Sequence, residues 1–337
     1  MMDFLAQAPL YVLPFLLVLT VVVTIHELGH FLVARAFGVK IDRFAIGFGR
    51  ALLSRTDRKG TEWRLGWIPF GGYVKFAGDL DPSSVPDQAG LDELKGRIIA
   101  EQGPAAIHDY FHFKPVWQRA LVVAAGPFAN FVLSIFIFTL LFSLIGVEIL
   151  PARVSEVSAG SPAASAGFQS GDLITGINGR RIEDSRDVTR IVSLSRGDRL
   201  RFMVERGGTE LTLTATPERQ VVTDPVAGRI TVGRIGLGLL PALDEVRHVR
   251  YGPLAAVGRG VSQTGDVLGT SVRYIGRIFM GRESGDQLSG PIGIAKASGA
   301  LTSAAVEANP DPGATAFNLI VVMTSFAAIL SIGIGFL

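Results

Sequence analysis

The chain has 337 residues, of which 48% are hydrophobic and 18% charged, and its net charge at pH 7 is +2. This balance is typical of a membrane protein with water-exposed parts. The small net charge and the lack of a basic cluster argue against nucleic acid as a partner. Cysteine is absent, so any bound metal must be held by nitrogen and oxygen ligands.

Three apolar runs are long enough to cross a bilayer, which takes about 20 apolar residues. They predict transmembrane helices within residues 1–37, 120–149 and 314–337. A secretory signal peptide is disfavoured for the first run, because it lacks a positively charged start and a small-residue cleavage site.

The first run ends in the sequence HELGH, which contains His26, Glu27 and His30. On a helix, histidines four residues apart share one face and can bind one zinc ion. Glu27 can take a proton from water activated by that ion. Ionisable groups are costly inside a span and usually functional. We therefore interpret the motif as a hydrolytic zinc site within the membrane, towards its cytoplasmic face, rather than as a chance match.

Basic residues follow the first span and precede the second, so the positive-inside rule places residues 38–119 in the cytoplasm. There, Gly71 and Gly72 lie between apolar and aromatic residues and predict a hairpin with a glycine turn. His108 and His112 repeat the spacing of the motif in a polar stretch. We expect these two to be surface or interfacial histidines rather than metal ligands.

The second run contains Gly126, Pro127 and Asn130. Small residues permit close helix packing, and one polar residue can join two helices. Asn130 either serves that packing or faces the metal and binds substrate backbone. The sequence leaves both alternatives open.

Beyond the second span, residues 150–220 predict a compact extracytoplasmic domain of strands and two short helices. The second helix is expected to begin with Ser185 as its cap, and Gly207-Gly208 to form a hairpin turn. Residues 221–313 predict an extracytoplasmic connecting region that includes an amphipathic helix.

HELGH, IPFGGYVKFAG, FKPVWQRALVVAAGPFANF, the outer domain and SGPIGIAK occur in one order and cover nearly the whole chain. Together they resemble the site-2 protease family of intramembrane zinc metalloproteases, in particular its bacterial RseP type. The resemblance implies an α-helical polytopic membrane protein with an inserted extracytoplasmic α+β PDZ-like domain, in the bacterial inner (plasma) membrane. Many relatives have two such domains, whereas this chain has one.

The resemblance also implies the chemistry: Zn2+ bound by His26 and His30, Glu27 as catalytic base, and Asn130 as the family's asparagine of the second core helix. The family cuts transmembrane segments of membrane-anchored regulators, typically after another protease has trimmed their outer part. A helical substrate must be unwound first, and strand addition at Gly71 and Gly72 could hold it extended. The alternative is an ordinary hairpin at the membrane surface.

The family's third zinc ligand, an aspartate in an Asp-Gly motif of a later helix, has no match here. We therefore expect a fragment whose third span is cut, with two of the three ligands that a catalytic zinc site needs. A non-catalytic, membrane-anchored PDZ module that binds protein termini is the alternative function, but it leaves Glu27 without a use. A transporter has little support because no inverted repeat is present. The expected partners are transmembrane protein substrates and the lipid bilayer, without nucleic acid; the oligomeric state stays open.

Overall fold

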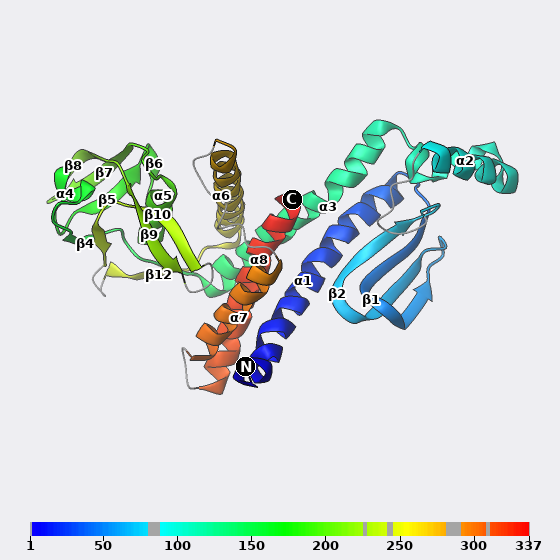
Figure 1. The fold of residues 1–337 in the computed structure, drawn as a ribbon, viewed down its shortest axis with the longest axis horizontal. Coiled ribbons are helices and arrows are strands. Elements are labelled where there is room, and N and C mark those ends of the chain that lie inside the picture. The colour runs from blue at the N-terminus through cyan, green and yellow to red at the C-terminus, as the bar shows by residue number, and fades with distance from the viewer. Residues whose placement is uncertain are drawn as a thin grey trace. The chain divides into compact units, whose positions relative to one another are not determined.

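The computed structural model describes residues 2–79, 88–224, 228–240, 245–280, 291–307 and 311–336 (Figure 1). The chain forms two compact units. Unit 1 consists of Met1–Leu140, Ala255–Thr270 and Ile294–Leu337, and unit 2 of Leu141–Leu254 and Ser271–Gly293.

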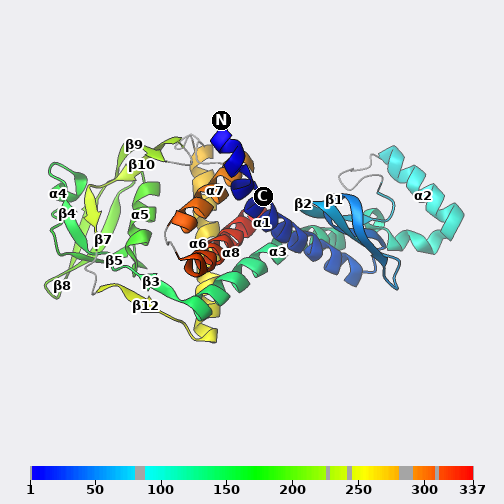
Figure 2. The ribbon, with the colours of Figure 1, turned by 90° about the horizontal axis from the view of Figure 1, so that it is seen from below.

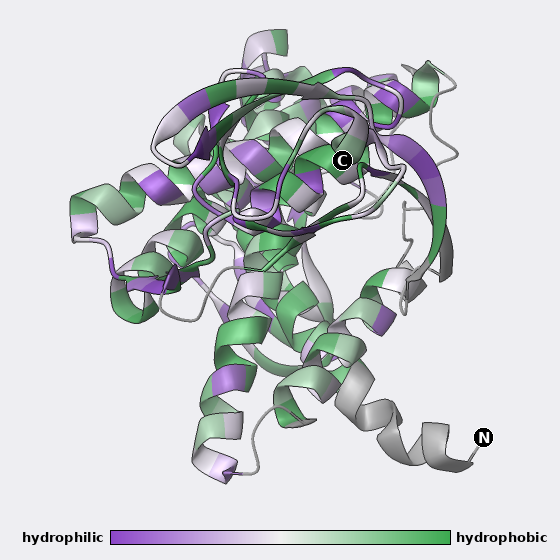
Figure 3. Cartoon of the chain, turned by 90° about the vertical axis from the view of Figure 1, so that its left-hand side faces the viewer, coloured by the Kyte–Doolittle hydropathy of each residue, from purple (hydrophilic) through white to green (hydrophobic). Residues whose placement is uncertain are grey.

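Three helices of unit 1 are long and apolar enough to cross a membrane: α1 (Met2–Ala36), α3 (Val116–Leu140, extended by a π-helical turn to Ile145) and α8 (Pro312–Phe336). Helix α1 packs against α3, and α8 packs against both. Hydrophobic colouring predominates on the long helices in Figure 3. The three predicted apolar runs thus form helices of spanning length.

The second of these helices ends earlier than the sequence predicted. Gly146 has a positive φ of 87°, and Val147–Ile149 form strand β3 instead of a last helical turn. β3 pairs with β12 (Arg247–Val249). A Cβ at Gly146 would lie 2.7 Å from the carbonyl oxygen of Val249, so a glycine is required where the helix gives way to the strand pair.

The remaining helices are α2 (Gln88–Gln102), which packs Leu94 and Ile98 against Tyr110, α6 (Pro253–Phe279) and α7 (Pro291–Glu307). Two short 3-10 segments, Pro104–Asp109 and Phe111–Phe113, connect α2 to α3.

Strands β1 (Ile41–Thr56) and β2 (Glu62–Phe76) form an antiparallel pair beside α1 (Figures 1 and 2). The predicted glycine turn is wrong: Gly71 and Gly72 lie inside β2, and Gly72 pairs with Ile46. The tight turn instead follows Asp57, whose N–H bonds the carbonyl of Thr61. The first half of β1 lies between the two halves of β2, because Phe44 pairs with Trp63 on one side and Val74 on the other.

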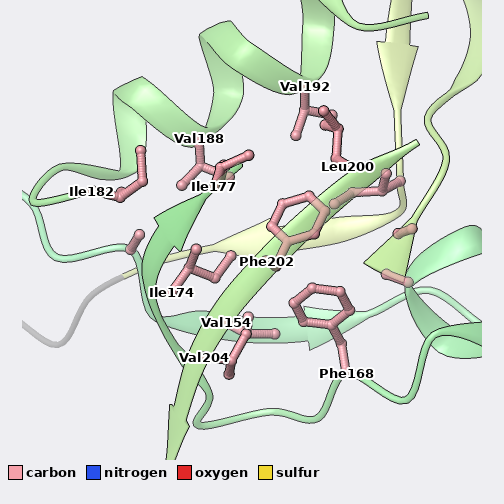
Figure 4. Packing of buried hydrophobic residues seen from close by; sticks show 14 residues of the cluster. Val154, Phe168, Ile174, Ile177, Ile182, Val188, Val192, Leu200, Phe202 and Val204 are labelled. Atoms are coloured by element: carbon pink, nitrogen blue, oxygen red, sulfur yellow. The ribbon is translucent and has the colours of Figure 1, made fainter. Parts of the chain in front are cut away.

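Unit 2 contains a four-stranded antiparallel sheet in the order β6-β5-β7-β8. Its strands are β5 (Leu173–Ile177), β6 (Arg180–Arg181), β7 (Leu200–Arg206) and β8 (Thr209–Ala215), with helices α4 (Pro162–Ser165) and α5 (Ser185–Leu194). Figure 4 shows Val188 and Val192 of α5 pointing towards the sheet, where Phe202 is fully buried. Gly207 and Gly208 both have positive φ between β7 and β8, as the hairpin prediction requires.

Two details of this unit differ from the prediction. Asp184, rather than Ser185, caps α5, because its carboxylate accepts the N–H of Arg186. The domain also extends past residue 220: after the hairpin of β9 (Glu218–Asp224) and β10 (Gly228–Arg234), strand β11 (Leu237–Leu239) pairs with β4 (Val154–Val157). Ile235 joins the core, with 3% of its surface exposed.

Candidate metal centre

The two histidines of HELGH lie together on α1, with their ring centroids 4.7 Å apart. Each ring is held through its Nδ1 atom by α3. His30 Nδ1 lies 2.7 Å from the carbonyl oxygen of Val122, so it must donate its proton there. This bond leaves Nε2 of His30 without a proton and free to bind a metal.

Asn130 holds the other ring. Its side-chain amide nitrogen lies 3.1 Å from His26 Nδ1, while its Oδ1 is buried without a hydrogen bond. A 180° flip of the side-chain amide would let Oδ1 accept a hydrogen bond from the N–H at His26 Nδ1. Nε2 of His26 would then carry no proton and could bind a metal. Asn130 is fully buried, and its main-chain carbonyl accepts a hydrogen bond from Ser331 of α8. The residue therefore lies at the histidine pair and also joins α3 to α8. Its binding of substrate backbone stays a prediction.

Both Nε2 atoms face the same point on α3. A Cβ at Gly126 would lie 2.4 Å from His30 Nε2 and 2.7 Å from His26 Nε2. Gly29 is the matching position on α1, where the helix faces the backbone of α3. A Cβ there would lie 2.3 Å from the carbonyl oxygen of Ala125. The two glycines let the helix backbones approach closely and keep side chains out of the space between the imidazoles.

This donor set fits Zn2+: two imidazole nitrogens on one face, their rings oriented by hydrogen bonds, and a carboxylate beside them. A catalytic zinc site needs a third protein ligand. Within the described part of the chain, no cluster of three or more His, Cys, Asp or Glu side chains could hold a metal ion.

We expect Gly126→Ala to lower zinc affinity at least about tenfold, an effect typical of disturbed ligand orientation. Alanine is the better helix former, so the loss must come from the clash of its methyl group with the two Nε2 atoms. Competition with a zinc chelator of known affinity measures this loss in the purified full-length gene product. Gly333→Ala on α8, where a Cβ meets nothing within 4 Å, is the matched control. Unchanged zinc affinity in the Gly126 variant would show that the glycine is not needed for the metal.

The carboxylate of Glu27 is held by the β sheet rather than by another helix. The N–H of Val74 in β2 donates to its Oε2 at 3.1 Å. Two turns earlier on α1, Thr20 Oγ1 accepts the N–H of Gly71 at 3.3 Å. β2 therefore runs along α1 directly beside the HELGH motif.

Gly71 and Gly72 allow this close approach. Gly71 has a positive φ of 91° and packs on Val23, and a Cβ at Gly72 would lie 2.6 Å from the carbonyl oxygen of Ala45. The structure thus places both residues on the strand beside Glu27. Their direct contact with a substrate stays a prediction.

Two groups at this site were missed by sequence reasoning, the carbonyl of Val122 and the N–H of Val74. Both belong to the backbone, so no side-chain signal could have identified them. The other histidine pair lies elsewhere: His112 Nε2 bonds Asp79 at 2.7 Å, and His108 is exposed.

Comparison with known proteins gives one family. The family model described as Peptidase family M50 matches residues 14–337. The metalloprotease MmpA of Caulobacter vibrioides is 44% identical over 322 residues, which cover 96% of this chain and 80% of that protein. Proteins named as zinc metalloproteases from Brucella suis and Agrobacterium fabrum are 44% and 39% identical, covering 84% and 97% of this chain and 73% and 81% of their own lengths.

Among solved structures, the PDZ domain of an SdrC-like protein from Listeria monocytogenes aligns with 29% of this chain and 94% of its own, at 23% identity. The TM-score of this alignment is 0.23.

Proposed function

Because the chain belongs to peptidase family M50, the site-2 proteases, and is therefore a zinc metalloprotease, we propose that it cleaves transmembrane segments of membrane-anchored regulatory proteins within the bilayer. One observation carries the proposal: His26, Glu27 and His30 lie within a helix of spanning length, Val12–Ala36. His26 is 14 residues from Val12, or about 21 Å along a helix, against a hydrocarbon thickness of about 30 Å.

In the proposed mechanism, His26 and His30 hold the metal through Nε2. Bound zinc would polarise the scissile carbonyl and make water a stronger nucleophile. Glu27, steadied by the N–H of Val74, removes a proton from the attacking water and passes it to the departing amide nitrogen. Val122 and Asn130 keep the two imidazoles turned towards the reaction.

The substrate has to present an extended backbone, because a helix hides its carbonyl groups in hydrogen bonds. We place the extended segment along β2, near Gly71 and Gly72, by strand addition. The N–H groups of Gly71 and Val74 already bond α1, so a substrate must use other groups of the strand or displace these bonds. In the simpler alternative, the two glycines serve only to bring β2 close to α1.

For the outer domain we propose a PDZ-like fold on the extracytoplasmic side that excludes substrates with bulky outer parts. The support is its place in the chain. β3 follows the end of the second span directly, and Ile149 of β3 pairs with Arg247 of β12. The domain is thus inserted between two adjacent strands close to the helix end.

Excision of residues 150–246, with Ile149 joined to Arg247 by a short Gly/Ser linker, tests this arrangement, because the joined residues are already neighbours. The assay uses the full-length gene product in membranes and two single-span reporters, one with a folded outer domain and one already trimmed. We expect the intact protein to cut only the trimmed reporter, within its apolar segment as mapped by mass spectrometry. The excised variant should cut both reporters.

Two outcomes would contradict these proposals separately. If the excised variant stays folded and zinc-loaded but no longer cuts the trimmed reporter, the domain recruits substrate instead of excluding it. If the intact, zinc-loaded protein cuts neither reporter inside the apolar segment, intramembrane proteolysis is wrong and a non-catalytic binding module is favoured.

A further inference from the structure

Helix α1 is joined to the β1–β2 sheet by three polar contacts spaced along its length. Thr20 accepts the N–H of Gly71, Glu27 accepts the N–H of Val74, and Arg35 pairs with Asp57 in the turn between the strands. Thr20 and Arg35 are fifteen residues apart, or about 22 Å along a helix. The proposed catalytic base therefore lies between two other attachment points of the same sheet.

The ion pair of Arg35 and Asp57, at the end of the helix, has more hydrogen-bond partners than the other two contacts. Arg35 Nη1 lies 2.6 Å from Asp57 Oδ2, which also accepts the indole N–H of Trp63 at 3.2 Å. The other oxygen of Asp57 accepts the N–H groups of Lys59 and Thr61. Hydrogen bonds from Arg35, and then from Trp63 and the two N–H groups, hold the pKa of Asp57 well below its usual range, so the carboxylate is ionised at neutral pH.

The ion pair covers an aromatic cluster that joins the helix to both strands. Phe31, directly after His30, packs against Phe44 of β1 and Trp63 of β2 with centroid distances of 5.3 and 5.0 Å. The Arg35 guanidinium lies 5.3 Å from the centre of the Phe31 ring. Phe31 and Phe44 are each 2% exposed. The helical turn that carries His30 is thus fixed to both strands, of which β2 also reaches Glu27.

We propose that Arg35 and Asp57 are positioning residues for Glu27: their ion pair fixes the strand pair on α1, so that the N–H of Val74 holds the carboxylate in the orientation needed for proton transfer. The inference rests on the proposed function of Glu27 as the base. A single 3.1 Å hydrogen bond joins β2 to that carboxylate, and a small shift of the strand would lengthen it. Neither Arg35 nor Asp57 touches the reacting atoms.

The test measures kcat and KM for the trimmed reporter, per zinc-loaded molecule of the full-length gene product. Arg35→Gln and Asp57→Asn should lower kcat by about 10- to 100-fold, the effect of a small misplacement of a catalytic group, with KM changed by less than about threefold. The kcat of the double variant should be about equal to that of the slower single variant, because the two residues act as one unit and their effects do not add. Arg35→Lys should recover part of the rate because it keeps the charge.

The Arg43–Glu62 pair is the matched control. It has the same 2.6 Å separation in the same sheet but joins β1 to β2 rather than to α1. Arg43→Gln and Glu62→Gln should keep kcat within about twofold. Zinc content and thermal melting are measured for every variant. If Arg35→Gln and Asp57→Asn do not accumulate as folded protein, Arg35→Lys is compared with Arg43→Lys.

Unchanged kcat in the Arg35 and Asp57 variants would overturn the inference, and so would an equal loss in the control variants, which would indicate a general effect of sheet stability. A Glu27→Gln reference assay separates this inference from its premise. If that reference is inactive and the Arg35 and Asp57 variants are fully active, only the positioning role is wrong. If the reference is itself active, Glu27 is not the base and the inference is overturned with its premise.

Discussion

Glu27→Gln is expected to slow cleavage of the trimmed reporter by at least about 10²- to 10⁴-fold, the contribution of a general base. The substitution keeps the size and shape of the side chain. The amide oxygen of the new residue can still accept the N–H of Val74, which now lies 3.1 Å from the carboxylate. What is lost is the ability to take a proton, so zinc content and folding should change little.

Turnover, metal content and thermal melting of the same full-length preparation test this expectation together. Glu62→Gln makes the same chemical change elsewhere on the sheet, at a side chain 29% exposed, and should keep most of the activity. Near-normal cleavage by the Glu27 variant would remove this residue from its proposed role. Loss of zinc together with activity would instead assign it to holding the metal.

The double substitution His26→Ala, His30→Ala should abolish zinc binding. We expect about one equivalent of zinc per chain in the full-length gene product, because its two proposed ligands on α1 converge on one point of α3. Either single substitution should also lose most of the metal, because each removes one of the two imidazole ligands. Atomic absorption or mass spectrometry under native conditions measures the occupancy.

The chain offers a matched control for this prediction in His108 and His112, which have the same spacing. His112 bonds Asp79, and His108 is exposed, so His108→Ala, His112→Ala should leave zinc occupancy unchanged. Full occupancy in the His26, His30 double variant would refute the assignment of the site. Added zinc should also raise the melting temperature of the unsubstituted protein and not that of the double variant.

Sequence reasoning identified the long helices well, because their apolar runs are long enough to decide the structure locally. It misplaced the turn of the β1–β2 pair. Two adjacent glycines between apolar residues fit a hairpin turn, but here they permit contact with Val23 and Ala45. The true turn begins at Asp57 and contains Gly60, a polar signal of the usual kind that was present in the sequence.

The boundary of the outer domain failed for another reason. β11 pairs with β4, about 80 residues earlier in the chain, and a pairing over that separation leaves no local pattern. The site shows the same limit. The spacing of His26, Glu27 and His30 is local and visible, whereas the partners of His30 and Glu27 are main-chain groups that only the fold brings near.

The pairing of β3 with β12 has a consequence for how the chain folds during synthesis. The strands that meet at Ile149 and Arg247 bring the two ends of the inserted segment together. A longer insert therefore adds little to the loop-closure entropy that is lost when the helices on either side of it pack. The segment between them has its own buried core around Phe202 and can fold as a unit once it leaves the ribosome. Insertions of different size, or a second domain in tandem, can therefore be accommodated at this point without altering the register of α1 against α3.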